Sequence, residues 1–248
     1  MTEVLREPLT GQNLIQLWER GAGQHPVDRG LATISACSGA PWDECAQASV
    51  GARDAMLLRI YERLFGGSLD AFAECPACGE RLEYSLMVGE LLSADPGPEN
   101  TGEVALETGE ISLRMRLPNS LDLAAAAQCA DAAAGRDLLL QRCVVEARAG
   151  TSDIPVAELP ASVVAMAEDR LAQADPLSDL TIDLNCAACG HVWQALLDIE
   201  SFLWAKLGTL AKRLLREVHV LAQAYGWSEA DILSMTPMRR EFYLQMVS

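Results

Sequence analysis

Two stretches of this sequence, Cys75-Pro-Ala-Cys78-Gly79-Glu80 and Cys186-Ala-Ala-Cys189-Gly190-His191, determine what fold it can adopt. Each stretch places two cysteines three positions apart and follows the second cysteine with a glycine. A two-residue spacer lets both sulfurs of one turn face the same ion, and four thiolates suit tetrahedral zinc. The glycine fits the positive φ that such a turn needs. The sequence therefore predicts one structural Zn2+ ion, held by Cys75, Cys78, Cys186 and Cys189.

The two motifs are far apart, because 107 residues lie between Cys78 and Cys186. Zinc sites of two CxxC pairs usually have roughly 15–20 residues between the pairs. The intervening chain must therefore be a folded excursion, which makes the site a split zinc ribbon. Four sulfur ligands close the coordination shell and leave no position for water or substrate, so we expect the ion to be structural.

Two other interpretations of the cysteine pairs stay open. A redox CxxC of the thioredoxin type begins a helix, but strand-like residues follow both pairs here. In the second interpretation, the four cysteines bind no metal and are simply buried side chains, as free cysteines often are. That the bound metal is zinc and not iron is a hypothesis, and elemental analysis tests it. His191 is a candidate alternate ligand, although a side chain that orients or covers the site is the favoured interpretation.

The hydrophobic period changes several times along the chain. Alternating polar and apolar residues around the two motifs predict two β-hairpins, with strands at Leu69–Glu74, Arg81–Val88, Leu180–Leu184 and Val192–Leu197. A further hairpin is expected from Val104–Leu106 and Ile111–Leu117. Helical spacing predicts helices at Gly11–Glu19 behind a Thr10 cap, Asp28–Cys37, Val50–Phe65, Leu121–Ala134, Arg136–Ala147, Pro160–Ala174, Leu203–Tyr225 and Pro237–Val247.

These elements predict an α+β protein. Helical N- and C-terminal parts surround the split zinc ribbon of two CxxC hairpins, and a helical insert separates the hairpins. The expected parts are N-terminal helices at 1–68, zinc-ribbon hairpins at 69–90 and 180–198, a hairpin plus helical insert at 91–179, and C-terminal helices at 199–248. Because the ion would clasp both hairpins, we expect a single folding unit.

The charge and hydropathy of the chain disfavour two classes of partner. Its net charge is −16, from 19 basic and 35 acidic residues, which disfavours nucleic acid because phosphate neutralisation supplies most of that affinity. No stretch approaches about 18 uncharged apolar residues, so we expect no membrane partner. Met1–Arg6 leads into Glu and Pro without an apolar segment, so we expect no signal peptide and a cytoplasmic protein.

The sequence offers no constellation for catalysis. Its Gly-rich stretches lack the Lys-Ser/Thr of a phosphate loop, and neither GxSxG nor HExxH occurs. A catalytic thiol would need a nearby base, and the chain has only three histidines. We therefore expect no enzyme. A redox or hydrolytic enzyme would require a free thiolate or an open metal position, which thiol titration with and without a chelator detects.

The last fifty residues hold a basic region on an acidic protein. In the simplest interpretation, helices pack against one another here and the arginines lie at the rim of their contact. In a second interpretation, the region resembles a DNA-binding helix-turn-helix. A third is a protein-docking surface, because aromatic and arginine side chains are enriched at interfaces. The candidate partner-binding residues are Tyr225, Trp227, Arg239, Arg240, Phe242 and Tyr243.

The same region carries a family resemblance, in residues 215–222 (LREVHVLA), 225–233 (YGWSEADIL) and 238–244 (MRREFYL). A helix, a Tyr-Gly-Trp turn and a closing Arg-Arg-Glu-Phe-Tyr helix resemble the T-even phage baseplate protein family. That family is also described as baseplate hub assembly chaperones and is found in bacterial contractile injection systems. The resemblance is carried mainly by residues 201–247. The two CxxC motifs and residues 69–86 add weaker support, and residues 89–180 resemble the family only loosely.

The resemblance implies a structural protein or assembly factor and not an enzyme. We therefore expect a non-enzymatic component or assembly chaperone for the baseplate of a phage tail-like contractile particle. Its partners would be baseplate, hub or spike proteins, and it would lie in the cytoplasm or be incorporated in the particle. The alternative function is that of a zinc-ribbon, nucleic-acid-associated regulator.

Overall fold

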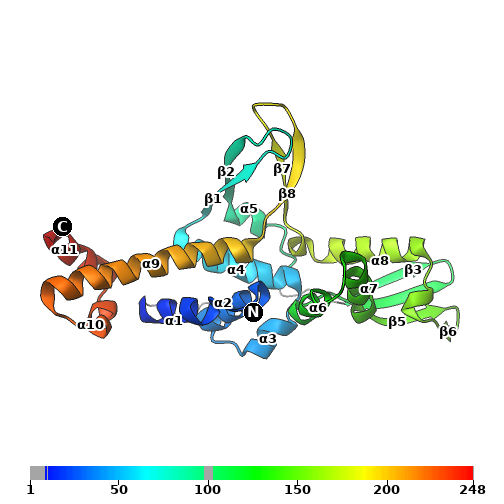
Figure 1. Ribbon diagram of the computed structural model, residues 1–248. Coiled ribbons are helices and arrows are strands. Elements are labelled where there is room, and N and C mark those ends of the chain that lie inside the picture. The colour runs from blue at the N-terminus through cyan, green and yellow to red at the C-terminus, as the bar shows by residue number, and fades with distance from the viewer. Residues whose placement is uncertain (1–8, 10, 98–102, 248) are drawn as a thin grey trace. The chain divides into compact units, whose positions relative to one another are not determined.

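A computed structural model describes residues 9, 11–97 and 103–247 of the chain and shows a mixed fold of helices and strands (Figure 1). These residues form two compact units. The middle unit consists of residues 43–199, and the terminal unit consists of residues 11–42 and 200–247. The Thr10 cap predicted for the first helix lies outside the described residues.

The terminal unit is helical. Its helices are α1 (Gly11–Gly21), α2 (Pro26–Ser38), α9 (Ile199–Tyr225), α10 (Glu229–Ser234) and α11 (Pro237–Val247). Along α9 the row of apolar side chains at three- and four-residue spacing is buried, from Leu203 and Leu207 to Val218 and Leu221. The Ser228 hydroxyl accepts a hydrogen bond from the Asp231 N–H and caps α10, as helix N-termini require. The predicted positions of α9 and α11 are thus close to the observed ones.

In the middle unit, α4 (Val50–Phe65) has the predicted bounds. Ser49 caps it by accepting a hydrogen bond from the Ala52 N–H, and most of its side chains are buried. The other helices of this unit are short, apart from α7 and α8. They are α3 (Trp42–Gln47), α5 (Val88–Leu92), α6 (Ser120–Ala126), α7 (Ala132–Cys143) and α8 (Ala161–Ala174), with single 3-10 turns at Val156–Glu158 and Pro176–Ser178.

The two predicted motif hairpins are present. The first pairs β1 (Ser68–Glu74) with β2 (Arg81–Met87), and the second pairs β7 (Thr181–Asn185) with β8 (Val192–Leu196), both antiparallel. Each hairpin is a separate two-stranded sheet, and the two rise side by side in Figure 1. Burial alternates along all four strands, so each hairpin has one covered and one exposed face.

A four-stranded antiparallel sheet forms between the two hairpins in sequence. Its strands are ordered β3 (Glu103–Thr108), β4 (Ile111–Arg116), β5 (Val144–Ala149) and β6 (Ser152–Asp153). Helix α8 lies along one face of this sheet in Figure 1, and it contributes Val163 and Ala167 to a buried apolar cluster. Leu106, Leu113 and Met115 of the strands complete the centre of that cluster. This sheet therefore has a hydrophobic core of its own.

The third strand of this sheet corrects the sequence analysis, which assigned Arg136–Ala147 to a helix within a helical insert. The structure ends α7 at Cys143 and continues as β5. A β-bulge explains the error, because the pairing shifts so that Met115 faces Val144 while Arg114 faces Glu146. The extra residue, Val145, interrupts the two-residue alternation by which a strand is recognised.

The helix predicted at Leu121–Ala134 is also two elements. Helix α6 ends at Ala126, and α7 begins at Ala132 behind Asp131, whose carboxylate accepts a hydrogen bond from the Ala134 N–H. Asn119 caps α6, and the Asp122 side chain accepts a hydrogen bond from the Asn119 N–H in return. Two caps in a run of alanines therefore divide what composition alone presents as one helix.

Candidate metal centre

The two cysteine motifs form turns of the same design. Strand β1 ends at Glu74, and the Cys75 N–H donates to the Glu80 carbonyl at 2.8 Å, while the Gly79 N–H donates to the Cys75 carbonyl at 2.8 Å. In the second turn the Cys186 N–H donates to the His191 carbonyl at 2.9 Å, and the Gly190 N–H to the Cys186 carbonyl at 2.8 Å. Each hairpin thus ends in a closed knuckle that fixes two sulfurs.

Glycine is needed at the same place in both knuckles. Gly79 and Gly190 each have a φ of 74°, in the left-handed region where a side chain is unfavourable. A Cβ at either position would meet no atom within 4 Å, so the requirement comes from the backbone angle and not from crowding.

The knuckles bring the four predicted sulfurs together. All four Sγ atoms lie within 4.8 Å of one another. The Cys75 and Cys189 sulfurs are 3.6 Å apart, and so are those of Cys78 and Cys186. A zinc ion with four sulfurs at about 2.3 Å would separate them by about 3.8 Å, whereas a disulfide requires about 2.05 Å. The spacing therefore fits four ligands of one ion and no disulfide.

The two cysteines of each knuckle differ in exposure. Cys75 and Cys186, the first of each pair, are buried, whereas Cys78 and Cys189 are exposed. Burial raises the pKa of the Cys75 thiol, but the Ala77 and Cys78 N–H groups and the neighbouring thiols lower that pKa to about 7. The Glu80 N–H lowers the pKa of Cys78, but the other thiols and burial raise it to about 12. Four adjacent thiols cannot all ionise unaided, so a bound cation is what would stabilise four thiolates.

His191 does not join this cluster. Among the described residues, the group of side chains that could hold a metal contains the four cysteines alone. The His191 ring instead stacks on Trp193, with the ring centres 5.9 Å apart. The His191 ring is therefore not one of the clustered ligands, and its covering of the site stays a prediction.

Comparison with known proteins gives the family. Residues 32–204 match the model of a family described as T4 bacteriophage base plate protein. The chain belongs to this family. No curated protein and no solved structure matches the chain. The baseplate family predicted from the sequence is confirmed. Of the residues that carried the resemblance, the knuckles and 69–86 lie within the match, whereas 201–247 lies almost entirely outside it. The match includes both knuckles and the four-stranded sheet, and it ends within the first turns of α9.

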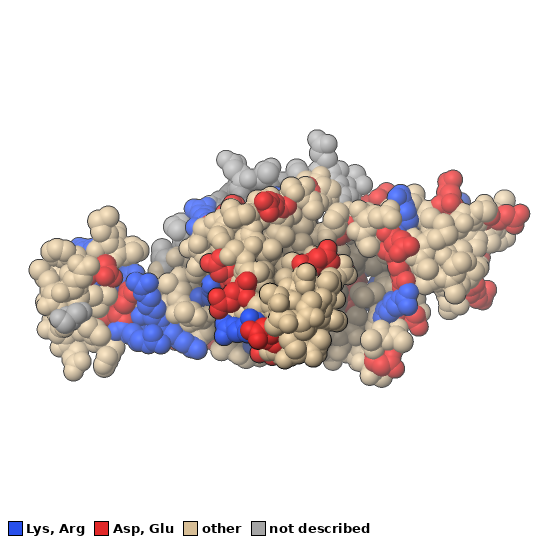
Figure 2. Space-filling view, turned by 90° about the horizontal axis from the view of Figure 1, so that it is seen from above, with Lys and Arg blue, Asp and Glu red and all other residues tan. Residues whose placement is uncertain are grey.

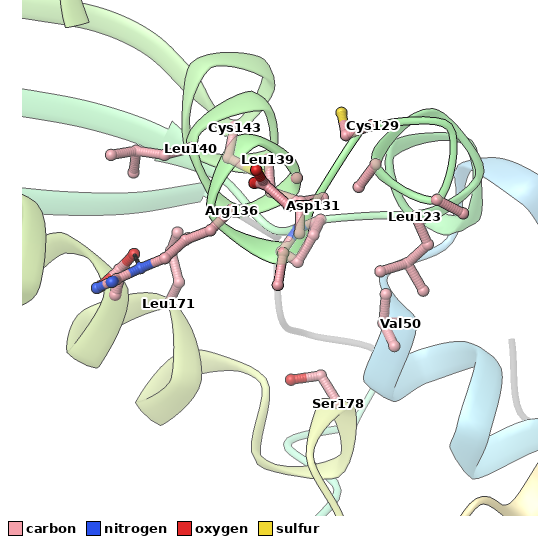
Figure 3. Close-up of a pocket in the computed structure, with 16 residues that line it drawn as sticks. Val50, Leu123, Cys129, Asp131, Arg136, Leu139, Leu140, Cys143, Leu171 and Ser178 are labelled. Carbon is pink, nitrogen blue, oxygen red and sulfur yellow. Dashed lines mark hydrogen bonds and ion pairs between the residues drawn. The ribbon is translucent and has the colours of Figure 1, made fainter. Parts of the chain in front are cut away.

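The middle unit of this baseplate family protein also contains a cavity of about 610 Å3 (Figure 3). Apolar side chains from several helices line most of it, among them Val50, Leu123 and Leu171. Its charged lining includes the ion pair between Arg136 and Glu168. No histidine lines the cavity, and burial raises the pKa of Cys143 there to about 11. Burial thus works against ionisation of the Cys143 thiol, and the mostly apolar lining suits an apolar group.

Sequence reasoning missed a buried ionic cluster beside this cavity. Asp122 is fully buried and accepts hydrogen bonds from Arg116 at 2.9 Å and from Arg142 at 2.6 Å. Burial raises the pKa of Asp122, but these two guanidinium groups and the Asn119 N–H lower it to about 2. The only signal in the sequence was the Asn-x-x-Asp capping pattern, because the two arginines come from other elements. The cluster joins α6, α7 and β4 and is structural.

The predicted partner-binding residues lie together in the terminal unit. The Tyr225 and Trp227 rings are stacked with centres 4.4 Å apart, and Tyr243 meets Trp227 edge-on at 4.8 Å. Phe242 is exposed, and the Arg239 guanidinium lies 5.8 Å from the Tyr243 ring centre. These aromatic residues therefore form one cluster that joins the end of α9 to α11.

Arg240 differs from the other residues of that set. Its side chain is buried, and it donates to the Glu217 carboxylate at 3.1 Å and to the Met235 carbonyl at 2.8 Å. A guanidinium held in this way fixes α11 against α9 and does not reach the surface. We therefore leave Arg240 out of the proposed partner surface.

The lengths and polarity of the helices also show whether any of them could cross a membrane. Across the ranges 11–97 and 103–247, each helix is too short or too polar to cross a membrane.

Proposed function

We propose that this chain is a non-enzymatic component or assembly factor of the baseplate of a phage tail-like contractile particle, acting by protein–protein binding. The observation that carries the proposal is the family match over residues 32–204. The expected partners are the hub, spike or other baseplate proteins of the same particle. On this proposal the protein is made in the cytoplasm and joins the particle there, either permanently or during assembly.

One structural Zn2+ ion, held by the four clustered cysteines, is part of the proposal. The 3.6 Å sulfur separations and the two matched knuckles support it. Zinc bound by four thiolates has a closed shell, so it would supply folding energy and no Lewis acid chemistry. Because the ligands come from two hairpins, the ion would clasp β1–β2 to β7–β8, which is the split-ribbon arrangement that the sequence suggested.

A role without catalysis is consistent with the side chains that line the cavity and with the Asp122 cluster. The cavity of Figure 3 lacks a histidine and holds a thiol of raised pKa, and the buried Asp122 is neutralised by two arginines. The perturbed carboxyl group of Asp122 thus has structural partners. We infer that the protein acts through its surfaces.

Purification from the native host tests the function. A tagged chain, expressed at its native level, should recover sheath, tube, hub or spike proteins that a tagged unrelated cytoplasmic protein does not recover. Density-gradient purification of intact particles then separates the two forms of the proposal, since a component stays with the particle and an assembly factor is absent from it. Recovery of no particle protein in either fraction would reject the proposal.

A second candidate, a nucleic-acid-associated regulator, is favoured by one observation. Residues 200–247 hold six basic and five acidic side chains although the whole chain carries −16, and Figure 2 shows a group of Lys and Arg side chains in the α9–α11 region. Arg213 and Arg240 contact carboxylates, which reduces the free positive charge. Duplex binding that weakens with salt and is lost on joint Arg216→Ala and Arg239→Ala substitution would support this candidate.

A further inference from the structure

The last helix of the terminal unit, α11, is apolar on two opposite faces. Its inner face turns toward the unit, with one buried and three half-buried side chains at helical spacing: Arg240, Tyr243, Leu244 and Val247. Its outer face carries Met238, Phe242 and Met246, which are 84%, 58% and 62% exposed. We call these three residues the outer ridge. A helix that is apolar on both sides is normally buried on both sides, so the outer ridge is an unsatisfied surface.

The spacing of the outer ridge indicates what shape would cover it. Met238, Phe242 and Met246 follow one another at intervals of four residues, so they form one continuous row along α11. Rows at this interval are the ridges that fit into the groove between the rows of a second helix. Methionine adapts its shape to the side chains it meets, and phenylalanine supplies a large rigid contact in the middle of the row.

The charges beside the outer ridge are mainly positive. Arg239 has no carboxylate partner among the described residues, and its guanidinium lies over the Tyr243 ring. On α9, Arg213 reaches toward Glu241 of α11 at 3.9 Å and is 65% exposed in its side chain. Arg216 follows three positions after Arg213 and is also exposed, so both side chains lie on the same part of α9. A partner with acidic side chains beside its apolar row would complement this setting.

A second copy of this chain could not supply such acidic side chains if the two copies met through their outer ridges. In a two-fold arrangement each α11 would face another α11, with its own Arg239 and with Arg213 nearby. The one carboxylate of α11, Glu241, already lies near Arg213. Self-association would therefore bring positive charge toward positive charge.

We propose that the outer ridge of α11 is a docking surface for an amphipathic helix with acidic flanks, carried by another protein of the baseplate. The inference rests on the proposed function and specifies the surface and the kind of segment that it binds. The aromatic cluster of Tyr225, Trp227 and Tyr243 joins α11 to the end of α9, and the Tyr225 hydroxyl also contacts the Met246 Sδ at 4.0 Å. The exposed remainder of the outer ridge makes the contact with the partner. The docking surface thus lies outside residues 32–204, the part that matches the family.

Site-specific photocrosslinking in the native host tests the docking surface. A photoreactive phenylalanine analogue replaces Phe242 in one strain and Gln223, an exposed polar position on α9, in the control strain. Crosslinked peptides are identified by mass spectrometry after affinity purification. The expected result is a product specific to position 242 in an acidic amphipathic helix of a baseplate protein. A product with a second copy of this chain, with a basic or non-helical segment, or with equal yield at position 223 would overturn the proposal.

The crosslinked protein is then purified and its affinity for the chain is measured. Joint Met238→Glu and Met246→Glu substitution should weaken binding about tenfold or more, since apolar anchors at the centre of an interface carry most of its affinity. Gln245→Glu, a matched exposed change on the same helix, should alter binding less than about twofold. Arg239→Glu should also weaken binding and reduce its dependence on salt. Equal affinities for all variants with unchanged helicity would overturn the proposal.

The two proposals fail in different ways. If the chain recovers baseplate proteins while every crosslink comes from other surfaces, the docking inference is wrong and the proposed function stands. If no baseplate protein is recovered at all, the proposed function is wrong, and the docking inference falls with it.

Discussion

The two motif hairpins and the four-stranded sheet belong to the same unit of this protein, but they differ in how many apolar side chains they bury. The hairpins bury few large side chains, chiefly Leu69 and Leu184 together with Cys75 and Cys186. The sheet instead packs against α7 and α8 through a cluster of ten buried apolar side chains. Two-stranded ribbons are marginal in water without further support. From this difference we predict that the order of the first region depends on a metal ion held by the cysteine cluster, and that of the second on apolar burial.

The largest effect is expected from loss of the metal. Cys186→Ser, or chelation, should abolish binding of one zinc per chain and lower the midpoint of thermal unfolding strongly, because structural zinc contributes on the order of 10 kcal/mol. Elemental analysis and calorimetry measure both quantities, and Cys129→Ser is the matched control. Amides of residues 68–87 and 181–196 should lose protection from hydrogen exchange first. An unfolding midpoint that barely moves would show that the hairpins do not depend on the metal.

The same calorimetry tests whether the chain is one folding unit, as the sequence suggested. A single transition that shifts as a whole on chelation would support that prediction. A second transition that stays at its original temperature would contradict it.

The next effect in size concerns the sheet. Met115 is fully buried in the apolar cluster, so Met115→Ala should cost about 3 kcal/mol of unfolding free energy through lost burial and a residual cavity. Met166→Ala on α8, at a position 40% exposed, should cost less than about 1 kcal/mol. Denaturant unfolding measures both. Zinc content should stay the same in both variants, and a loss of zinc from Met115→Ala would mean that the two regions are not supported independently.

A smaller effect belongs to the ionic cluster at the edge of the sheet. The pKa of Asp122 is lowered to about 2, so its ionised form stabilises the folded state by about 2 kcal/mol. This contribution is complete above the unfolded pKa near 4 and is lost as the pH falls from about 4 to about 2. Asp122→Asn should therefore be less stable than the native chain at pH 6, and the difference should shrink at pH 3. Asp153→Asn, an exposed change, should give no such pH-dependent difference.

The smallest effect tests whether the two knuckles are equivalent. Gly79→Ala and Gly190→Ala should each cost about 1 kcal/mol, because both glycines have a φ of 74°. Gly89→Ala, in the short helix α5 where a Cβ meets nothing within 4 Å, should be neutral or slightly stabilising. Zinc competition assays and thermal unfolding compare the three variants. Unequal costs at positions 79 and 190 would break the equivalence of the two turns.

The hairpins and the four-stranded sheet also differ in how well the sequence alone predicts them. The knuckles are predictable from local sequence. Within six residues, the spacing of the two cysteines places the sulfurs, and the glycine that follows them permits the turn. The strand β5 does not, because the bulge at Val145 interrupts its alternation and its partner β4 lies some thirty residues away. The Asp122 cluster likewise depends on Arg142, twenty positions further along the chain.

The terminal unit shows the same limit. The aromatic residues around Tyr225 and Trp227 were visible as a cluster of types in the sequence. The burial of Arg240 was not, because it depends on Glu217, which lies twenty-three positions earlier on α9. The outer ridge of α11 was also missed, since a row of three apolar residues is normally a core-facing stripe, and only the fold shows which of two apolar faces is inside.

The separation of the two knuckles along the chain has a consequence for biosynthesis. Cys78 and Cys186 are 108 positions apart, so at a translation rate of about 5–20 residues per second the first knuckle leaves the ribosome roughly 5–20 seconds before the second. On the proposed zinc site, the two thiols of the first knuckle are only half of the ligand set during that interval and would hold an ion weakly. The four-stranded sheet, which lies entirely between them, can fold in the meantime from its own apolar core. The order of synthesis thus favours a protein whose middle is already folded when the last cysteine arrives to close the clasp.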